Sequence, residues 1–201
     1  MTLTELVRRQ TDAKRIAEHL DALPQTRRIE EVMALSASDQ KTLYELAATA
    51  PPVDFEFFVP AGVPDGREVI HHGRNSLPAF RSFQKRWCRP RGRTDQLYGY
   101  NETLVRPLIG PGYFVARETD GGGRDPRGAI VVDYYQVPEG PVAEGWPLVR
   151  PNSRGLQRFV YFETRDYMRR FSSHCSIGAA HKQEKKLIGY FVLCRDESSD
   201  A

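Results

Sequence analysis

The chain has 201 residues, a length that fits one domain with an N-terminal extension. Hydrophobic residues make up 40% and charged residues 27%, which excludes a disordered chain and predicts a packed core. The formal net charge is only +3, so no strong overall field favours nucleic acid or an anionic membrane as a partner.

Cysteine usage and the N-terminal residues bear on the compartment. The three cysteines are odd in number and show no C-x-x-C spacing, which indicates free thiols in a reducing environment. The N-terminal stretch is charged from Glu5 onward and lacks the apolar segment of a signal peptide. No apolar run reaches the roughly 20 residues needed to span a bilayer. We therefore expect a cytoplasmic protein with no membrane partner.

Residues 1–50 carry apolar residues near the helical period, with charged residues on the opposite faces. This pattern predicts two or three amphipathic helices, with Thr4 and Ser36 as N-caps and Pro51 as a stop. One face of each helix must pack against something. We expect it to pack on the rest of the chain, and a protein partner docking through these helices is the alternative.

After Pro52 the pattern changes. Residues 53–59 alternate apolar and acidic side chains, as an edge strand would, and residues 67–72 fit a short strand. Asn75 or Ser76 can then cap a helix over 76–89, because Phe80, Phe83 and Trp87 follow one another at helical spacing.

The second half of the chain is dominated by runs rich in β-branched and aromatic residues, bounded by turn-forming residues. No helices of the βαβ type separate them, which favours an antiparallel sheet. A helix is expected after Thr164, and the proline-rich segment 138–155 is predicted to form a long loop. The predicted strands cover 112–119, 128–137, 156–164 and 187–194.

These elements together predict an α+β fold. An N-terminal helical segment over 1–50 is followed by a curved, mainly antiparallel β-sheet domain over 53–197 with one or two helices packed on it. A disordered tail is expected over 198–201.

The stretch from His71 to Ser76 is the main candidate site. A helix N-terminus beside two imidazoles and the Arg74 guanidinium would be a physically sound receptor for an anionic group. We therefore expect a non-enzymatic domain that binds an anionic or amphipathic small molecule between its aromatic strands and this helix start. The histidine spacings match no zinc motif, and we expect neither a metal nor a cofactor. The expected ligand-binding residues are His71, His72, Arg74, Asn75, Tyr100 and His174.

An enzyme is the first alternative. His71 or His174 would act as general base, with Asp133, Tyr100 or Cys175 nearby. Sequence adjacency cannot show whether these groups meet in space.

An interaction module is the second alternative, acting through the basic run 85–93. This run contains Trp87, an aromatic residue that could stack on a base. Asp95 and Glu102 follow closely, the overall charge is modest and no nucleic-acid motif is present, so nucleic acid is not the expected partner.

Overall fold

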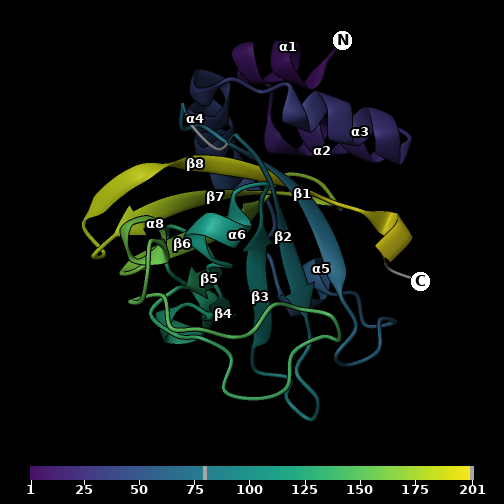
Figure 1. Cartoon of the computed structure of the whole chain (residues 1–201). Coiled ribbons are helices and arrows are strands. Elements are labelled where there is room, and N and C mark those ends of the chain that lie inside the picture. Colours follow the sequence, from purple (N-terminus) through teal and green to yellow (C-terminus); the bar gives the residue numbers. More distant parts are fainter. Residues whose placement is uncertain (79–80, 200–201) are drawn as a thin grey trace.

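Eight antiparallel strands close into a barrel in the computed structural model, which describes residues 1–78 and 81–199 (Figure 1). Each strand pairs with its neighbours in sequence, and β1 pairs with β8 to close the ring. The strands are β1 (Val69–Asn75), β2 (Ser82–Cys88), β3 (Leu97–Glu102), β4 (Phe114–Glu118), β5 (Ile130–Asp133), β6 (Thr164–Arg170), β7 (Cys175–Lys182) and β8 (Lys186–Arg195).

Alternation along the strands sorts side chains between the interior and the outer surface. On β2, Lys85 and Trp87 point inside, whereas Cys88 packs outside against residues of β3 and β4. The short helix α5 (Phe55–Phe58) closes one end of the interior, where the Phe58 ring stacks on Trp87 with centroids 4.5 Å apart. That end is therefore filled with apolar side chains.

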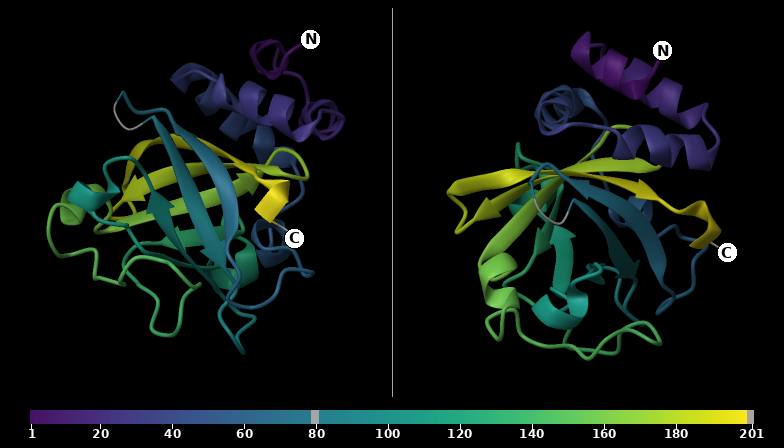
Figure 2. Two further views of the ribbon diagram at one scale, coloured as in Figure 1. Left: turned by 45° about the vertical axis from the view of Figure 1, so that its right-hand side comes forward. Right: turned by 45° about the horizontal axis from the view of Figure 1, so that its top comes forward.

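The N-terminal segment forms four α-helices that pack over the outer surface of β7 and β8 (Figure 2, right). One apolar core joins the helices to the barrel wall, with Leu43 on the helical side and Ile177 and Val192 on the strands. Packing within the chain, as expected, covers these apolar faces. The helices are α1 (Leu3–Arg8), α2 (Ala13–Asp21), α3 (Gln25–Met33) and α4 (Ala37–Leu46), followed by a 3-10 turn η1 (Ala47–Thr49).

The helix caps agree in part with the sequence. Ser36 caps α4 as expected, because its hydroxyl accepts a hydrogen bond from the backbone N–H of Asp39 at 3.2 Å. The first helix is capped by Thr2 instead of Thr4, and a separate helix begins at Asp12, whose carboxylate accepts from the N–H of Arg15. This second cap explains why four helices form instead of two or three.

The prediction of a helix over residues 76–89 is wrong. Residues 82–88 form β2, which pairs on one side with β1 and on the other with β3. Phe83, Lys85 and Trp87 point to one face at a period of two, and pairing with both neighbours satisfies the backbone along this strand. Phe80, which we expected on the buried face of the helix, lies outside the described residues.

Three further expectations differ from the structure. Residues 53–59 do not form the expected edge strand. They contain the helix α5, whose N-cap Asp54 accepts a hydrogen bond from the N–H of Phe57 at 2.8 Å. Most of the strand expected over 156–164 is the short helix α8 (Gln157–Val160) and a turn. The helix expected after Thr164 is β6, because partners on both β5 and β7 complete its ladder.

The other late strands are confirmed as β4, β5 and β8, and the antiparallel sheet with packed helices is confirmed as well. Closure into a barrel replaces the open curved sheet. Of the expected tail 198–201, the first two residues end the 3-10 turn η2 (Glu197–Ser199), and the last two lie outside the described residues. Two short helices remain in the connections, α6 (Arg106–Ile109) and α7 (Asp120–Gly123).

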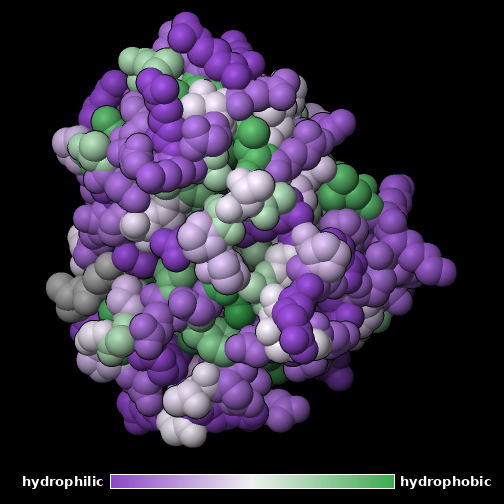
Figure 3. Space-filling model, turned by 180° about the vertical axis from the view of Figure 1, so that it is seen from behind, coloured by the Kyte–Doolittle hydropathy of each residue, from purple (hydrophilic) through white to green (hydrophobic). Residues whose placement is uncertain are grey.

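The up-and-down order gives the barrel two different ends. The β1–β2, β3–β4, β5–β6 and β7–β8 connections lie together at the end opposite α5, and Figure 2 (left) shows α6, α8 and the β7–β8 turn there. Seen from behind, hydrophilic side chains cover most of the surface, with small groups of hydrophobic ones between them (Figure 3). Among the described residues, every helix is too short or too polar to cross a membrane.

Candidate functional site

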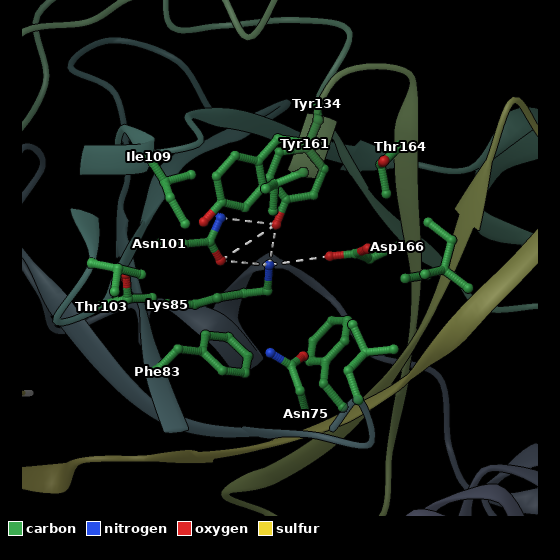
Figure 4. A pocket seen from close by; sticks show the side chains of 16 residues that line it. Asn75, Phe83, Lys85, Asn101, Thr103, Ile109, Tyr134, Tyr161, Thr164 and Asp166 are labelled. Carbon is green, nitrogen blue, oxygen red and sulfur yellow. Dashed lines mark hydrogen bonds and ion pairs between the residues drawn. The ribbon is translucent and has the colours of Figure 1, made fainter. Parts of the chain in front are cut away.

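A cavity of about 140 Å³ occupies the half of the barrel interior that α5 does not fill (Figure 4). Phe83 and Phe191 form part of its wall, and Val105, Ile109 and Val160 lie toward its mouth. An apolar cavity of about 150 Å³ is known to hold a benzene-sized molecule. The interior therefore has room for one ring or a short chain.

The base of the cavity is a hydrogen-bonded group around Lys85. Its ammonium donates to Asn101 Oδ1 at 3.2 Å, to Asp166 Oδ2 at 3.1 Å and to the Tyr134 hydroxyl oxygen (Figure 4). Lys85 is 1% exposed and Asp166 is 3% exposed. All three N–H groups of a buried ammonium are thus satisfied, which is the condition under which burying it is tolerated.

Strand pairing places these four side chains. Lys85 and Asn101 are direct partners in the β2–β3 ladder and both point inward. Asp166 reaches them from β6, and Tyr134 follows the last residue of β5. The ion pair joins residues 81 positions apart, so closure of the barrel is what brings the charges together.

Aromatic rings surround the Lys85 ammonium, which lies 4.8 Å from the ring centroid of Phe114, 4.9 Å from that of Phe191 and 5.0 Å from that of Tyr134. Ring faces attract a cation. Burial lowers the pKa of Lys85, against the opposing effect of the Asp166 carboxylate. Burial likewise raises the pKa of Asp166 and raises that of Tyr134 well above its ordinary value, so the phenol is protonated at neutral pH.

A buried hydroxyl belongs to the cavity lining. Thr164 is 5% exposed and lines the cavity, and its Oγ1 makes no hydrogen bond within the described part of the chain. A buried polar atom without a partner costs free energy, and such atoms are rare in folded proteins. The Thr164 Oγ1 atom is itself buried, so it becomes available to a polar atom of a bound molecule when the side chain rotates about χ1.

The two adjacent histidines do not meet in this cavity. His71 points into the barrel at the α5 end, where its Nε2–H donates to the Phe58 carbonyl at 3.0 Å and burial lowers its pKa to about 3. His72 points outward, with its Nε2 3.0 Å from Asp196. On a strand, neighbouring side chains face opposite sides, and no helix start exists at this position.

The other expected site residues are also separated. Of them, Asn75 lines the cavity (Figure 4). Arg74 lies on the outward-facing side of β1, and Tyr100 packs outside against Trp146 with ring centroids 5.0 Å apart. His174 lies in the β6–β7 turn, 3.1 Å from Arg195.

The residues expected to act together in an enzyme are not hydrogen-bonded to one another in the described part of the chain. Within the described residues, no hydrogen bond connects His71 or His174 with Asp133, Tyr100 or Cys175. Asp133 accepts from Arg165 on the outer surface at 3.0 Å.

The thiols are buried as well. Cys175 lies with its sulfur 3.5 Å from that of Cys194, and burial raises its pKa well above the ordinary value. A thiol with a raised pKa is a poor nucleophile. Cys88, the third free cysteine, is also buried, and burial raises its pKa to about 12.

The basic run 85–93 is divided by strand alternation. Lys85 and Trp87 lie inside the barrel, and Trp87 is 0% exposed. Its ring is therefore not available to stack on a base. Among the described residues, no group of three or more His, Cys, Asp or Glu side chains is placed to hold a metal ion.

Lys85, Asn101, Tyr134, Thr164 and Asp166 were not among the residues expected from the sequence. One pattern in the sequence does point to this site. Over residues 82–88, alternate positions place a lysine, Lys85, on the same strand face as the aromatic residues Phe83 and Trp87. Comparisons with protein-family models, with curated proteins and with solved structures found no match. The geometry of the cavity is therefore the basis for a proposed function.

Proposed function

We propose that this protein is a non-enzymatic domain that binds an amphipathic small molecule inside the barrel. The observation that carries the proposal is the cavity itself, which is open at one end, walled by aromatic rings and lined by the Lys85–Asp166 ion pair and by Thr164, whose buried hydroxyl has no partner among the described residues. Concave, mostly apolar sites with a few convergent polar groups are typical of small-molecule binding.

The size and charge of the cavity limit the ligand. About 140 Å³ accommodates a ring or a short chain, and any longer part would extend through the mouth. The head group would be uncharged, because Lys85 already has Asp166 as its counter-ion and a second anion would remain unbalanced. An alcohol or a carbonyl compound fits both requirements, with its oxygen near Thr164.

Calorimetric titration with 1-hexanol and with hexanoate tests this proposal. Hexanol should bind more tightly than hexanoate at neutral pH. Thr164→Val removes the free hydroxyl without changing the side-chain shape, and should weaken hexanol binding by about three- to tenfold. Thr26→Val, on the exposed surface of α3, is the matched control and should leave binding unchanged.

A second variant removes the cavity. Ala180 lines it, so Ala180→Phe should fill it and abolish binding while circular dichroism remains that of the native protein. If neither probe binds the native protein, or if both bind the folded Ala180→Phe variant as well as the native one, the cavity is not the binding site. Native mass spectrometry of the purified protein would reveal any co-purified ligand.

A further inference from the structure

Exposed hydrophobic side chains gather at the open end of the barrel. Leu108 is 71% exposed and Phe159 is 75% exposed, and Leu104 is completely so. Large exposed apolar side chains are ordinary when scattered, but a group of them marks an interaction surface. We call the following residues the apolar rim: Leu77, Leu104, Leu108, Leu156, Phe159, Val160, Leu187 and Ile188.

All four connections at this end contribute to the apolar rim. Leu77 follows β1, Leu104 and Leu108 lie between β3 and β4, Phe159 belongs to α8, and Ile188 lies at the start of β8. Leu77 and Ile188 also line the cavity, as does Val160. The apolar rim therefore surrounds the mouth through which a ligand would enter.

Positive charge accompanies the apolar rim. Arg158 precedes Phe159, Lys185 lies in the β7–β8 turn, and Lys186 is the first residue of β8, before Leu187. All three basic side chains are exposed and make no ion pair within the described part of the chain. They are thus free to meet phosphate groups.

The acidic residues nearest the apolar rim are already engaged. Glu102 accepts from Arg106 at 2.8 Å, and Glu184 accepts from Arg165 at 2.6 Å. Glu163 accepts from the side chain of Gln183 at 2.6 Å. Glu163 is bonded to a neutral amide and keeps its charge, while Arg158, Lys185 and Lys186 have no ion pair, so the balance of unpaired charge at this end is positive.

We propose that the apolar rim docks on the surface of an anionic lipid bilayer. Its side chains project from separate loops around an opening, an arrangement that suits a soft surface better than the continuous face of a folded partner. Apolar tips enter the interface between head groups and acyl chains, while lysine and arginine meet the anionic lipids. Docked in this way, the cavity opens toward the lipid.

This inference goes beyond the proposed function and does not require it. It differs from the expectation of no membrane partner, which follows from the lack of a spanning segment and from the small net charge. Apolar residues that are scattered along four loops form no hydrophobic run in the sequence.

Vesicle flotation tests the docking, with no added ligand. The protein should float with vesicles that contain about one third phosphatidylglycerol in phosphatidylcholine, and much less with phosphatidylcholine alone. Leu108→Ser combined with Phe159→Ser should lower the affinity by roughly tenfold or more. Leu148→Ser is the matched control and should float like the native protein, because Leu148 is 73% exposed and follows the stretch of the β5–β6 connection whose Ala143 and Trp146 pack on the outside of the barrel wall.

A fluorescence experiment reports the contact directly. Phe159→Trp should show a blue shift on addition of the anionic vesicles, and Leu148→Trp should not. The native Trp87 is buried and Trp146 is partly buried, and the native protein measured in parallel supplies their background. Lys185→Glu combined with Lys186→Glu should weaken binding to anionic vesicles, as should high salt.

Failure of the native protein to bind either kind of vesicle would overturn the proposal. So would binding that the Leu108→Ser and Phe159→Ser double variant leaves unchanged, or self-association through Phe159 without vesicle binding. Thr164→Val and Ala180→Phe should float normally, because they alter the cavity and not the apolar rim. Loss of ligand binding and loss of vesicle binding are therefore distinguishable.

Discussion

Lys85 is the residue around which the cavity is organised. Moving an ammonium and a carboxylate out of water costs several kcal/mol per ion, and their mutual attraction offsets this only when the remaining hydrogen bonds are satisfied. Here Asn101 and Tyr134 supply those bonds. An apolar pair of similar size would fill the same space without the desolvation cost, so stability alone does not explain the ion pair.

The first prediction concerns this ion pair. Lys85→Met leaves Asp166 buried without its cation, and should lower the free energy of unfolding by about 3–5 kcal/mol. Lys85→Met combined with Asp166→Leu should recover most of that loss, since no charge then remains buried. Urea denaturation measures both variants. Equal stability of the single and double variants would show that the two charges are not coupled.

The second prediction concerns His71 and pH. Burial holds its pKa at about 3, below the ordinary value of 6.5, so the unfolded chain takes up a proton that the folded chain does not. The contribution of neutral, buried His71 to the free energy of unfolding is fully present above pH 6.5 and is lost as the pH falls toward 3. The free energy of unfolding should decrease by about 1.4 kcal/mol per pH unit well below the unfolded pKa.

His71→Gln keeps a donor near the Phe58 carbonyl but cannot titrate. Urea denaturation at about pH 7, 6 and 5 should give a shallower pH dependence for this variant than for the native protein. The two proteins differ only at residue 71, so the difference between their pH profiles isolates His71. Parallel pH profiles would mean that His71 is accessible to protons in the folded state.

At the scale of elements, pairs of glycine and aromatic residues shape the inside of the barrel. Gly178 on β7 pairs with Phe191 on β8, and Gly73 on β1 pairs with Phe83 on β2. A Cβ at Gly178 would lie 2.2 Å from the Phe191 ring, which means that the ring lies directly over the glycine backbone. These glycines let large rings line a narrow interior.

The third prediction follows from this close approach. Gly178→Ala should lower the free energy of unfolding by about 1–3 kcal/mol, because the ring or the strand must move. Gly62→Ala is the matched control, since a Cβ there would meet no atom within 4 Å and should cost little. Thermal or urea unfolding compares the two. A Gly178→Ala variant as stable as the control would show that the ring has room to move.

In the molecule as a whole, the N-terminal helices cover part of the outer surface of the barrel. β7 and β8 present Ile177 and Val192 on their outer faces, where water would otherwise meet them. The helices cover these residues with Leu6, Ile16 and Leu43. The helical segment is therefore expected to stabilise the barrel through burial of apolar surface.

The fourth prediction tests that role. Removal of residues 1–50 should expose the shared core and produce aggregation, visible as a high-mass species in size-exclusion chromatography and as increased binding of a hydrophobic dye. Lys41→Ala, on an exposed part of α4, should remain monomeric and serves as the full-length control. A soluble, cooperatively folding fragment 51–201 would show that the helices are dispensable.

Features that depend on neighbouring residues could be predicted from the sequence. Ser36 marked a helix start, and the runs that became β4, β5 and β8 contained β-branched and aromatic residues between turns. Local hydrogen bonds and short-range periodicity are sufficient for such elements. Composition likewise predicted a packed core.

The other features depend on contacts that form only in the closed barrel. The segment around Phe83 and Trp87 satisfied both the helical and the strand spacing, and pairing with β1 and β3 chose the strand. The meeting of Lys85 with Asp166, and of four loops around one mouth, required the barrel to close. The physical reason is that these contacts join residues far apart in the chain, whose proximity is fixed by the strand register and not by any local pattern.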